Sequence, residues 1–210
     1  MSEDGKHGKD PARWEKRYIE GDTPWDSDEP DIHLQWVLEE FDVAPCAAVV
    51  IGCGTGTNAV WLSEVGFETV GLDLSATAIA AATQRASDSG ATCSFQAIDF
   101  LADELPAGTF GMAFDRGCFH CFDEPSERAA FAARVASVLE PEGLWTSVIG
   151  STDGPDRESG PPRRSAADIA LAIESHFEIL HLESTVFDQD EHAQARAWVL
   201  VARRRQHVVQ

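Results

Sequence analysis

The hydrophobic positions of the chain alternate between short apolar runs and longer segments with helical spacing. Five apolar runs have the length and composition of buried strands: residues 47–51, 68–74, 92–98, 110–115 and 143–150. Two further strand-like runs close the chain, at residues 177–184 and 195–204. Strands that alternate with helices are typical of a parallel sheet, so the pattern predicts an α/β fold.

Signals of helix ends lie between the first strands. Residues 57–66 read as a helix that we expect to end at Gly66, because glycine adopts the left-handed backbone common at that position. Ser75 stands directly before the alanine-rich stretch 76–86, where its hydroxyl is suited to cap a helix.

The second half of the chain carries similar signals. Phe131, Val135 and Val138 have the spacing of one helical face. After a loop rich in glycine and proline, Ser165 and Asp168 have the spacing of a capping box, which predicts another helix start.

Two short helical stretches precede the first strand, near residues 11–19 and 31–41. The second has an apolar stripe that we interpret as core packing: Leu34, Val37, Leu38 and Phe41. We therefore expect an N-terminal helical lid over residues 1–42, a core over 43–205 and a short tail over 206–210.

Charge narrows the choice of partners. The formal net charge is −20, which argues against binding nucleic acid because phosphate contacts need a basic face. No apolar run approaches the roughly 20 residues that cross a membrane, and the polar N-terminus does not resemble a secretory signal. The sequence thus predicts a cytoplasmic protein without a membrane partner, either a monomer or a homodimer.

The five cysteines are an odd number, which favours free thiols in a cytoplasmic chain. Cys118, His120 and Cys121 lie close together, but no second Cys/His pair has the spacing of a zinc site. We therefore expect no metal ion.

A glycine-rich turn follows the first strand and suits a nucleotide ligand. Gly52, Gly54 and Gly56 give a G-x-G-x-G pattern, with Thr57 where a dinucleotide fingerprint has its third glycine. Asp73 ends the second strand, where a carboxylate binds ribose hydroxyls. A nucleoside without a pyrophosphate fits this turn better than NAD, which favours S-adenosylmethionine. Nicotinamide-dependent oxidoreduction remains an alternative at this point.

The order of motifs resembles that of class I S-adenosylmethionine-dependent methyltransferases. The segments that carry the resemblance are GCGTG, GLDLS, AIDF, FDRGCFH and LEPEGLW, and the likeness covers roughly residues 45–205. It implies a Rossmann-like, mostly parallel seven-stranded sheet with helices on both faces and an antiparallel last strand.

The same resemblance implies roles for individual residues. It places Asp73 and Leu74 at the ribose, Asp99 at the adenine amine and Phe100 against the adenine ring. It also places Asp115 and Arg116 near the methionine part of the cofactor.

One departure points to a branch of this family. Val50 stands where most members carry an acidic residue, and the branch of thiopurine, thiol and halide methyltransferases is also apolar there. The segment WEKRYIEGDTPWD resembles the N-terminus of thiol and halide methyltransferases, which implies that Trp14, Tyr18 and Trp25 wrap the cofactor. Aromatic faces attract a sulfonium cation, and a lid of this kind excludes water.

The acceptor site is less defined. The GPP segment at 160–162 resembles a loop that borders the acceptor in this branch. A soft, charged acceptor needs no general base, whereas a hydroxyl or amine would use His120 or Asp115. We interpret Cys118 and Cys121 as packing thiols, because the acceptor attacks the cofactor directly.

Together these observations predict a methyltransferase that uses S-adenosylmethionine, releases S-adenosylhomocysteine and acts on a small molecule. A thiol, hydrosulfide or other soft anion is the favoured acceptor. The alternatives are O- or N-methylation of a small metabolite and binding of the cofactor without catalysis.

Overall fold

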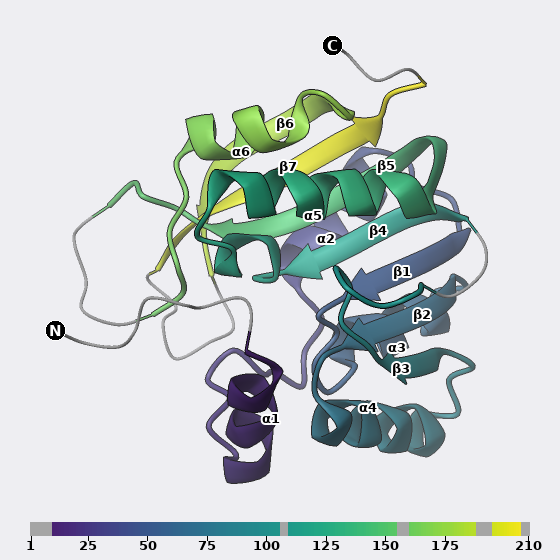
Figure 1. The fold of residues 1–210 in the computed structure, drawn as a ribbon. Coiled ribbons are helices and arrows are strands. Elements are labelled where there is room, and N and C mark those ends of the chain that lie inside the picture. The colour runs from purple at the N-terminus through teal and green to yellow at the C-terminus, as the bar shows by residue number, and fades with distance from the viewer. Residues whose placement is uncertain (1–9, 106–108, 155–159, 188–194, 207–210) are drawn as a thin grey trace, which may run out of the picture.

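A computed structural model describes residues 10–105, 109–154, 160–187 and 195–206. Its centre is one seven-stranded sheet with the order β3-β2-β1-β4-β5-β7-β6 (Figure 1). The strands are β1 (Ala47–Ile51), β2 (Glu68–Asp73), β3 (Ser94–Ala97), β4 (Phe110–Arg116), β5 (Leu139–Gly150), β6 (Phe177–Val186) and β7 (Arg196–Arg204).

The strand directions follow the expected pattern. Parallel pairing joins β1 to β2 and β4, β2 to β3, and β4 to β5. The last strand, β7, is antiparallel to both of its neighbours, β5 and β6. The sequence-based prediction of a Rossmann-like, mostly parallel sheet with an antiparallel last strand is therefore confirmed.

Helices cover both faces of the sheet. The helices are α1 (Pro11–Glu20), α2 (Ile32–Glu40), α3 (Thr57–Glu64), α4 (Ala76–Ser89), α5 (Pro125–Val138) and α6 (Ala166–Ile173), with a 3₁₀ turn at Phe119–Cys121. In Figure 1, α5 and α6 lie in front of the sheet and α2 behind it, while α1 lies beside α4 and apart from the sheet.

Apolar side chains fill the space between these layers. On the α5 and α6 face, Phe131, Trp145 and Phe177 are fully buried in one cluster. On the opposite face, Leu34 of α2 and Leu62 of α3 belong to a second cluster. The apolar stripe of α2 thus packs in the core as expected, and α2 belongs with the sheet. We therefore restrict the term lid segment to residues 10–31.

Some element boundaries differ from the sequence-based expectation. The strand expected at 92–98 is only Ser94–Ala97, and the one expected at 143–150 begins earlier, at Leu139. Helix α3 ends at Glu64 with Val65 as its C-cap, so the assignment of Gly66 as the cap was wrong by one residue. The capping box of Ser165 and Asp168 at the start of α6 is confirmed.

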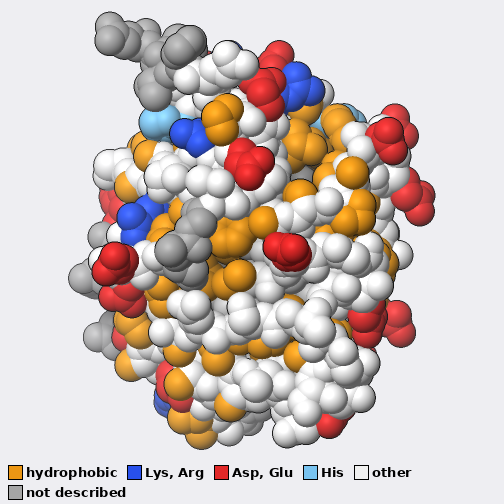
Figure 2. All heavy atoms as spheres, turned by 90° about the vertical axis from the view of Figure 1, so that its right-hand side faces the viewer, with side chains coloured by type: hydrophobic (Ala, Val, Ile, Leu, Met, Phe, Trp, Pro, Cys, Tyr) orange, Lys and Arg blue, Asp and Glu red, His pale blue; other side chains and the backbone are white. Residues whose placement is uncertain are grey.

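Acidic side chains are prominent on the surface. Figure 2 shows the face at the right of Figure 1, where Asp and Glu side chains lie mostly near the margin and basic ones are few. Within the described residues, no helix is long and apolar enough to span a membrane.

Candidate functional site

A cavity of about 1170 Å³ opens at the carboxyl ends of β1, β2 and β4, beneath the lid segment. Ligands of open α/β sheets bind at this edge. The cavity is larger than the usual range of about 300–1,000 Å³ for a small-molecule pocket, so it has room for a cofactor and an acceptor together.

Most of the residues that the sequence predicted for the site line this cavity. They are Trp14, Tyr18, Trp25, Gly52, Gly54, Asp73, Leu74, Asp99, Phe100, Arg116 and His120. Gly56 and Asp115 are not among the lining residues.

The glycine-rich turn places its glycines in different environments. Gly54 has a φ of 56°, and a Cβ added there would lie 2.9 Å from the Tyr18 hydroxyl. Gly56 is buried with a φ of 88°, and a Cβ there would lie 2.8 Å from Cβ of Ala82 in α4. Gly56 therefore allows close helix packing, and it is not among the lining residues of the cavity, so its assignment as a cofactor contact stays a prediction.

Asp73 joins the turn to the start of α4. One carboxylate oxygen accepts a hydrogen bond from the Gly54 amide at 2.9 Å, and the other accepts from the Ser75 amide at 2.9 Å. Burial raises the pKa of Asp73, although these hydrogen bonds act in the opposite direction. The carboxylate is only 9% exposed.

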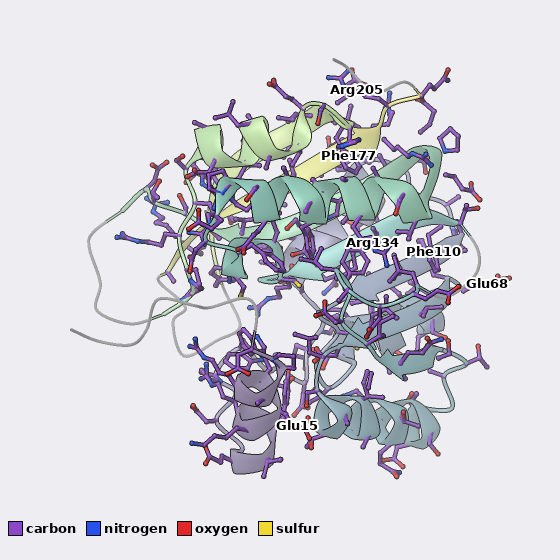
Figure 3. All side chains as sticks on the ribbon, viewed as in Figure 1. Glu15, Glu68, Phe110, Arg134, Phe177 and Arg205 are labelled. Atoms are coloured by element: carbon purple, nitrogen blue, oxygen red, sulfur yellow. The ribbon has the colours of Figure 1, made fainter. Side chains whose placement is uncertain are left out.

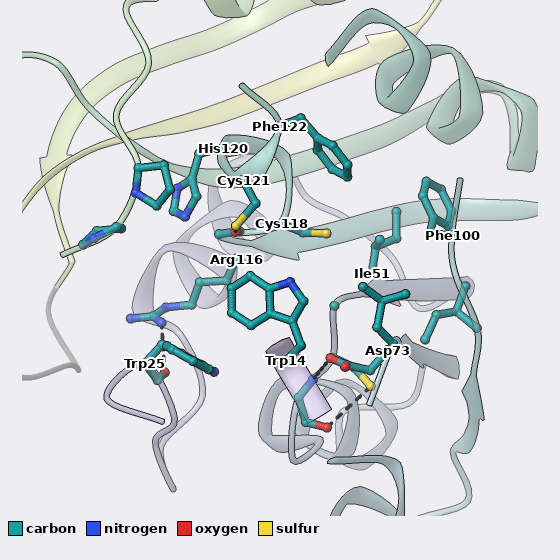
Figure 4. Close-up of a pocket in the computed structure, with 18 of the residues that line it drawn as sticks. Trp14, Trp25, Ile51, Asp73, Phe100, Arg116, Cys118, His120, Cys121 and Phe122 are labelled. Atoms are coloured by element: carbon teal, nitrogen blue, oxygen red, sulfur yellow. Dashed lines mark hydrogen bonds between the residues drawn. The ribbon is translucent and has the colours of Figure 1, made fainter. Parts of the chain in front are cut away.

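Residues after β3 form another wall. The Asp99 carboxylate accepts hydrogen bonds from the Leu101 and Ala102 amides and so stabilises a turn. Phe100 is buried, and its ring lies 5.3 Å from that of Phe131. In Figure 4, Phe100 and Phe122 lie on the same side of the cavity as Ile51. The side chains of Ile51, Phe100 and Phe122 make this side apolar, which suits an aromatic base.

The aromatic side chains of the lid segment contact one another. The Trp25 ring lies 5.4 Å from Trp14 and 6.1 Å from Tyr18, edge to face in both pairs. Trp25 Nε1 donates a hydrogen bond to the Tyr18 hydroxyl at 3.2 Å. Figure 4 shows the Trp14 indole near the middle of the view, between Asp73 on one side and Arg116 and Trp25 on the other.

The glycine-rich turn also holds the lid segment through its threonines, which sequence reasoning missed. The Thr55 hydroxyl donates to the Asp26 carboxylate at 2.7 Å, and the Thr57 hydroxyl donates to the Ser27 carbonyl at 2.5 Å. Thr57 is the residue that replaces the third glycine of the dinucleotide fingerprint. Its replacement therefore coincides with an added contact to the lid segment.

A second missed residue is Glu15 of α1. Its carboxylate accepts a hydrogen bond from the Ser75 hydroxyl and one from the Thr77 hydroxyl, each at 2.6 Å. It also accepts from the Thr77 amide at 3.2 Å. The hydrogen bonds from Ser75 and Thr77 lower the pKa of Glu15. The sequence feature that could have indicated an acidic partner is the Ser-x-Thr sequence at the start of α4, because the first amides of a helix need an acceptor.

Arg116 binds the lid segment. Its Nε donates to the Asp31 carboxylate at 2.8 Å, and its Nη1 donates to the Trp25 carbonyl at 3.1 Å. Asp31 is only 1% exposed and also caps α2. The guanidinium thus connects the end of β4 to the chain that follows Trp25, in addition to lining the cavity.

Asp115 is a buried structural group. One oxygen accepts from the Cys118 and Phe119 amides, and the other accepts from Trp145 Nε1 at 2.9 Å. Burial raises the pKa of its carboxyl. Because Asp115 is fully buried and does not line the cavity, the structure does not support its assignment as a catalytic or cofactor-binding residue.

His120 lines the cavity with a fixed tautomer. Its Nδ1 accepts a hydrogen bond from the Gly150 amide at 2.8 Å. A backbone amide only donates, so Nδ1 carries no hydrogen and Nε2 carries the one hydrogen of the neutral ring. In this arrangement neither ring nitrogen is available to accept a proton.

Three free thiols also border the cavity, from Cys53, Cys118 and Cys121. Burial raises the pKa of Cys118 well above its ordinary value and that of Cys121 to about 12, so both remain protonated thiols. A protonated thiol is a poor nucleophile, which agrees with a packing role.

The GPP segment closes the far side of the cavity. Gly160, Pro161 and Pro162 line it, together with His120 and Phe187. This second side lies away from Phe100 and carries the His120 ring, as Figure 4 shows. It is the part of the cavity where we expect the acceptor.

Residues 9–209 match the family model described as thiopurine S-methyltransferase. The chain is 34% identical over 164 residues to the probable thiol methyltransferase 2 of Arabidopsis thaliana, covering 77% of this chain and 69% of that protein. It is 32% identical over 156 residues to thiocyanate methyltransferase 1 of Brassica oleracea, covering 73% and 67% respectively.

Solved structures show the same fold. One of them comes from work on the conversion of a disulfide bond into a thioacetal group during echinomycin biosynthesis. It has a TM-score of 0.77 at 23% identity, and the match covers 93% of this chain and 91% of that one. A Burkholderia thailandensis 1,6-didemethyltoxoflavin-N1-methyltransferase with bound S-adenosylhomocysteine has a TM-score of 0.74 at 19% identity, covering 93% and 87%.

Proposed function

Because this chain belongs to the thiopurine S-methyltransferase family and is an S-adenosylmethionine-dependent methyltransferase, we propose that its acceptor is a small thiol, hydrosulfide or other soft anion. Family membership decides between S-adenosylmethionine and a nicotinamide dinucleotide in favour of the former. The altered glycine fingerprint agrees with this choice, because Gly56 packs on α4 and Thr57 binds the lid segment.

The single observation that carries the acceptor class is the hydrogen bond from the Gly150 amide to His120 Nδ1. A hydroxyl or amine acceptor must lose a proton, and the sequence offered only His120 and Asp115 as bases. The accepting nitrogen of His120, Nδ1, is already engaged by the Gly150 amide, and Asp115 does not line the cavity. An acceptor that already carries negative charge needs neither residue.

The names of the relatives support the same class. The two plant proteins with the matches described above are named thiol and thiocyanate methyltransferases, and both names denote soft sulfur acceptors.

The residues of the cavity fit the cofactor. When bound, S-adenosylmethionine supplies an electrophilic methyl group that a nucleophile takes by in-line displacement. Asp73 and Leu74 would hold the ribose, and Asp99 and Phe100 would hold the adenine. Trp14 and Trp25 would present aromatic faces to the sulfonium, an attraction of roughly 0.5–2 kcal/mol each.

The chain's further contribution is alignment and exclusion of water. The lid segment covers the cavity, so an anionic acceptor would lose its hydration shell on entry. Neutral His120 would donate hydrogen bonds only, and the protonated thiols of Cys118 and Cys121 would not compete for the methyl group. Proximity of this kind supplies several kcal/mol of the barrier.

The test combines an acceptor panel with a pH profile. Labelled S-adenosylmethionine is incubated with hydrosulfide, small thiols, thiocyanate and iodide, and the volatile methylated products are identified. Thiocyanate and iodide are anions at every accessible pH, so their kcat should be flat from about pH 6 to 9, while thiols should speed up toward their own pKa of about 8.5.

Phenols, alcohols and amines are the controls that decide the alternatives. A hydroxyl or amine acceptor that is methylated faster than every sulfur and halide acceptor would replace this proposal with O- or N-methylation. Binding of S-adenosylmethionine without turnover on any acceptor would support a binding protein without catalysis.

A further inference from the structure

We propose that Glu15 is a positioning residue that latches the lid segment to the N-terminus of α4 and so sets how long the cofactor stays bound. The inference rests on a lid over the cofactor site, as in the proposed function, but it does not depend on which acceptor is methylated. Figure 3 shows the Glu15 side chain between α1 and α4.

Helix α1 has little other means of attachment. None of its residues is fully buried, and its one large aliphatic side chain, Ile19, is 67% exposed. Its aromatic residues Trp14 and Tyr18 are half-buried, but their described ring contacts are with Trp25 of the same segment, so polar contacts largely set how α1 meets α4. Among the hydrogen bonds of α1 side chains to the sheet-and-helix core, those of Glu15 to Ser75 and Thr77 are the shortest described, at 2.6 Å.

The receiving site is suited to an anion. The first amides of a helix have no partner within the helix, and its dipole is positive at that end. Glu15 accepts from the Thr77 amide and from two hydroxyls, while the Ser75 hydroxyl also accepts from the Ala78 amide as the helix cap. The carboxylate thus caps α4 from a separate helix.

The latch is adjacent to the predicted ribose site. The Ser75 amide donates to the same Asp73 carboxylate that accepts from Gly54, and Gly54 lies beneath the Tyr18 hydroxyl of α1. Glu15 therefore holds Trp14 and Tyr18, its neighbours on α1, over the carboxylate that we assign to the ribose. Release of the latch should open the cofactor side of the cavity.

The experiment compares Glu15→Gln with a matched control on the same helix, Glu20→Gln. Among the contacts of the described residues, Glu20 forms an exposed pair with Lys16 at 3.8 Å, so this control removes the same charge without touching α4. Dissociation of S-adenosylhomocysteine is followed by stopped-flow tryptophan fluorescence in the full-length protein. We expect dissociation to be about tenfold faster in Glu15→Gln and unchanged in Glu20→Gln, because lost contacts act mainly on the dissociation rate.

Trypsin provides a second readout, because Arg13, Lys16 and Arg17 all lie in α1. With S-adenosylhomocysteine present, cleavage in α1 should be several-fold faster in Glu15→Gln than in Glu20→Gln. Thr77→Val removes the hydroxyl that donates to Glu15. Its effect on dissociation should not add to that of Glu15→Gln, since both variants disrupt the same contact between Glu15 and Thr77.

A purely structural cap would behave differently. It would lower the melting temperature in Glu15→Gln while dissociation and trypsin cleavage matched the Glu20→Gln control, and that result would overturn the proposal. Additive effects of Glu15→Gln and Thr77→Val would also overturn it. Because the ligand is S-adenosylhomocysteine alone, an incorrect acceptor assignment does not alter any of these outcomes.

Discussion

The sheet core and the lid segment are held together by different kinds of interaction. The core buries large apolar side chains completely, among them Phe114, Phe119 and Trp145. The lid segment instead attaches through hydrogen bonds and one buried ion pair, with Glu15 on α4, Asp26 on Thr55 and Asp31 on Arg116.

This difference indicates which part can move during a catalytic cycle. Burying a side chain such as Phe119 stabilises the fold by roughly 1.5–3 kcal/mol, whereas a hydrogen bond contributes about 0.5–1.5 kcal/mol net. Water replaces a broken hydrogen bond at the lid segment, but nothing replaces lost packing in the core. We therefore expect the lid segment to open and close while the sheet remains folded.

Removal of the lid segment tests this comparison most severely. Deletion of residues 1–28 should lower kcat/KM by roughly 100-fold or more, because the aromatic faces and the exclusion of water are lost. The melting temperature should change little, since every strand and the buried Asp31–Arg116 pair remain. Full activity in the truncated protein would show that Trp14, Tyr18 and Trp25 are packing residues only.

A smaller effect is expected at Asp73, where the two regions meet. Asp73→Ala should weaken binding of S-adenosylhomocysteine by roughly 1–3 kcal/mol in calorimetry, because ribose hydroxyls lose a charged acceptor. It should also lower the free energy of unfolding, since the Gly54 and Ser75 amides lose their acceptor. Asp73→Asn is the control, because it keeps one accepting oxygen. Its free energy of unfolding should be higher than that of Asp73→Ala. Unchanged affinity in both variants would exclude Asp73 from the ribose site.

The core and much of the lining of the cavity were predictable from sequence. Strand periodicity, the glycine turn and Asp73 at the end of β2 are local signals, because each depends on residues near one another in the chain. The capping box of Ser165 and Asp168 was read correctly for the same reason.

Contacts between distant segments were not predictable. Glu15 meets Ser75 across 60 positions and Arg116 meets Asp31 across 85, and no periodicity links such pairs. Asp115 was assigned from its place in a motif, but which way its side chain faces depends on Trp145, another strand's residue. The packing of Gly56 against Ala82 also joins two separate elements, so the glycine turn alone did not reveal it.

Asp115 belongs to the core, so its replacement should affect stability and not catalysis. Asp115→Asn should lower the free energy of unfolding by about 1–3 kcal/mol, because an amide nitrogen would face Trp145 Nε1 in place of an acceptor. Activity should fall only as far as the folded fraction falls. A loss of kcat in fully folded Asp115→Asn protein would contradict the structural role and restore a catalytic one.

The pH dependence of the wild type relative to this variant follows from the pKa of Asp115, which burial raises above its ordinary value of 3.8. For a raised folded-state pKa, the contribution to stability is fully present below 3.8 and is lost as the pH rises through the folded value. Urea unfolding at several pH values should show this decline in the wild type relative to Asp115→Asn. A difference that grows with pH would contradict the assigned direction.

The smallest effect is expected at Arg17, which belongs to the lid segment alone. Its guanidinium lies 4.1 Å from the centroid of the Trp25 ring and forms an ion pair with Asp22 at 3.0 Å. Asp22 is 65% exposed, so the ion pair contributes at most about 1 kcal/mol, and an exposed cation–π contact adds about 0.5–1 kcal/mol. Arg17→Gln should therefore raise KM for S-adenosylmethionine by roughly two- to fivefold at low salt, and less at high salt because screening already weakens the pair. Arg17→Lys keeps the charge but loses the planar stacking, so its KM should lie between that of the wild type and that of Arg17→Gln. A rise above tenfold, or a large loss of kcat, would mean that Arg17 contacts a reactant and is more than a support for Trp25.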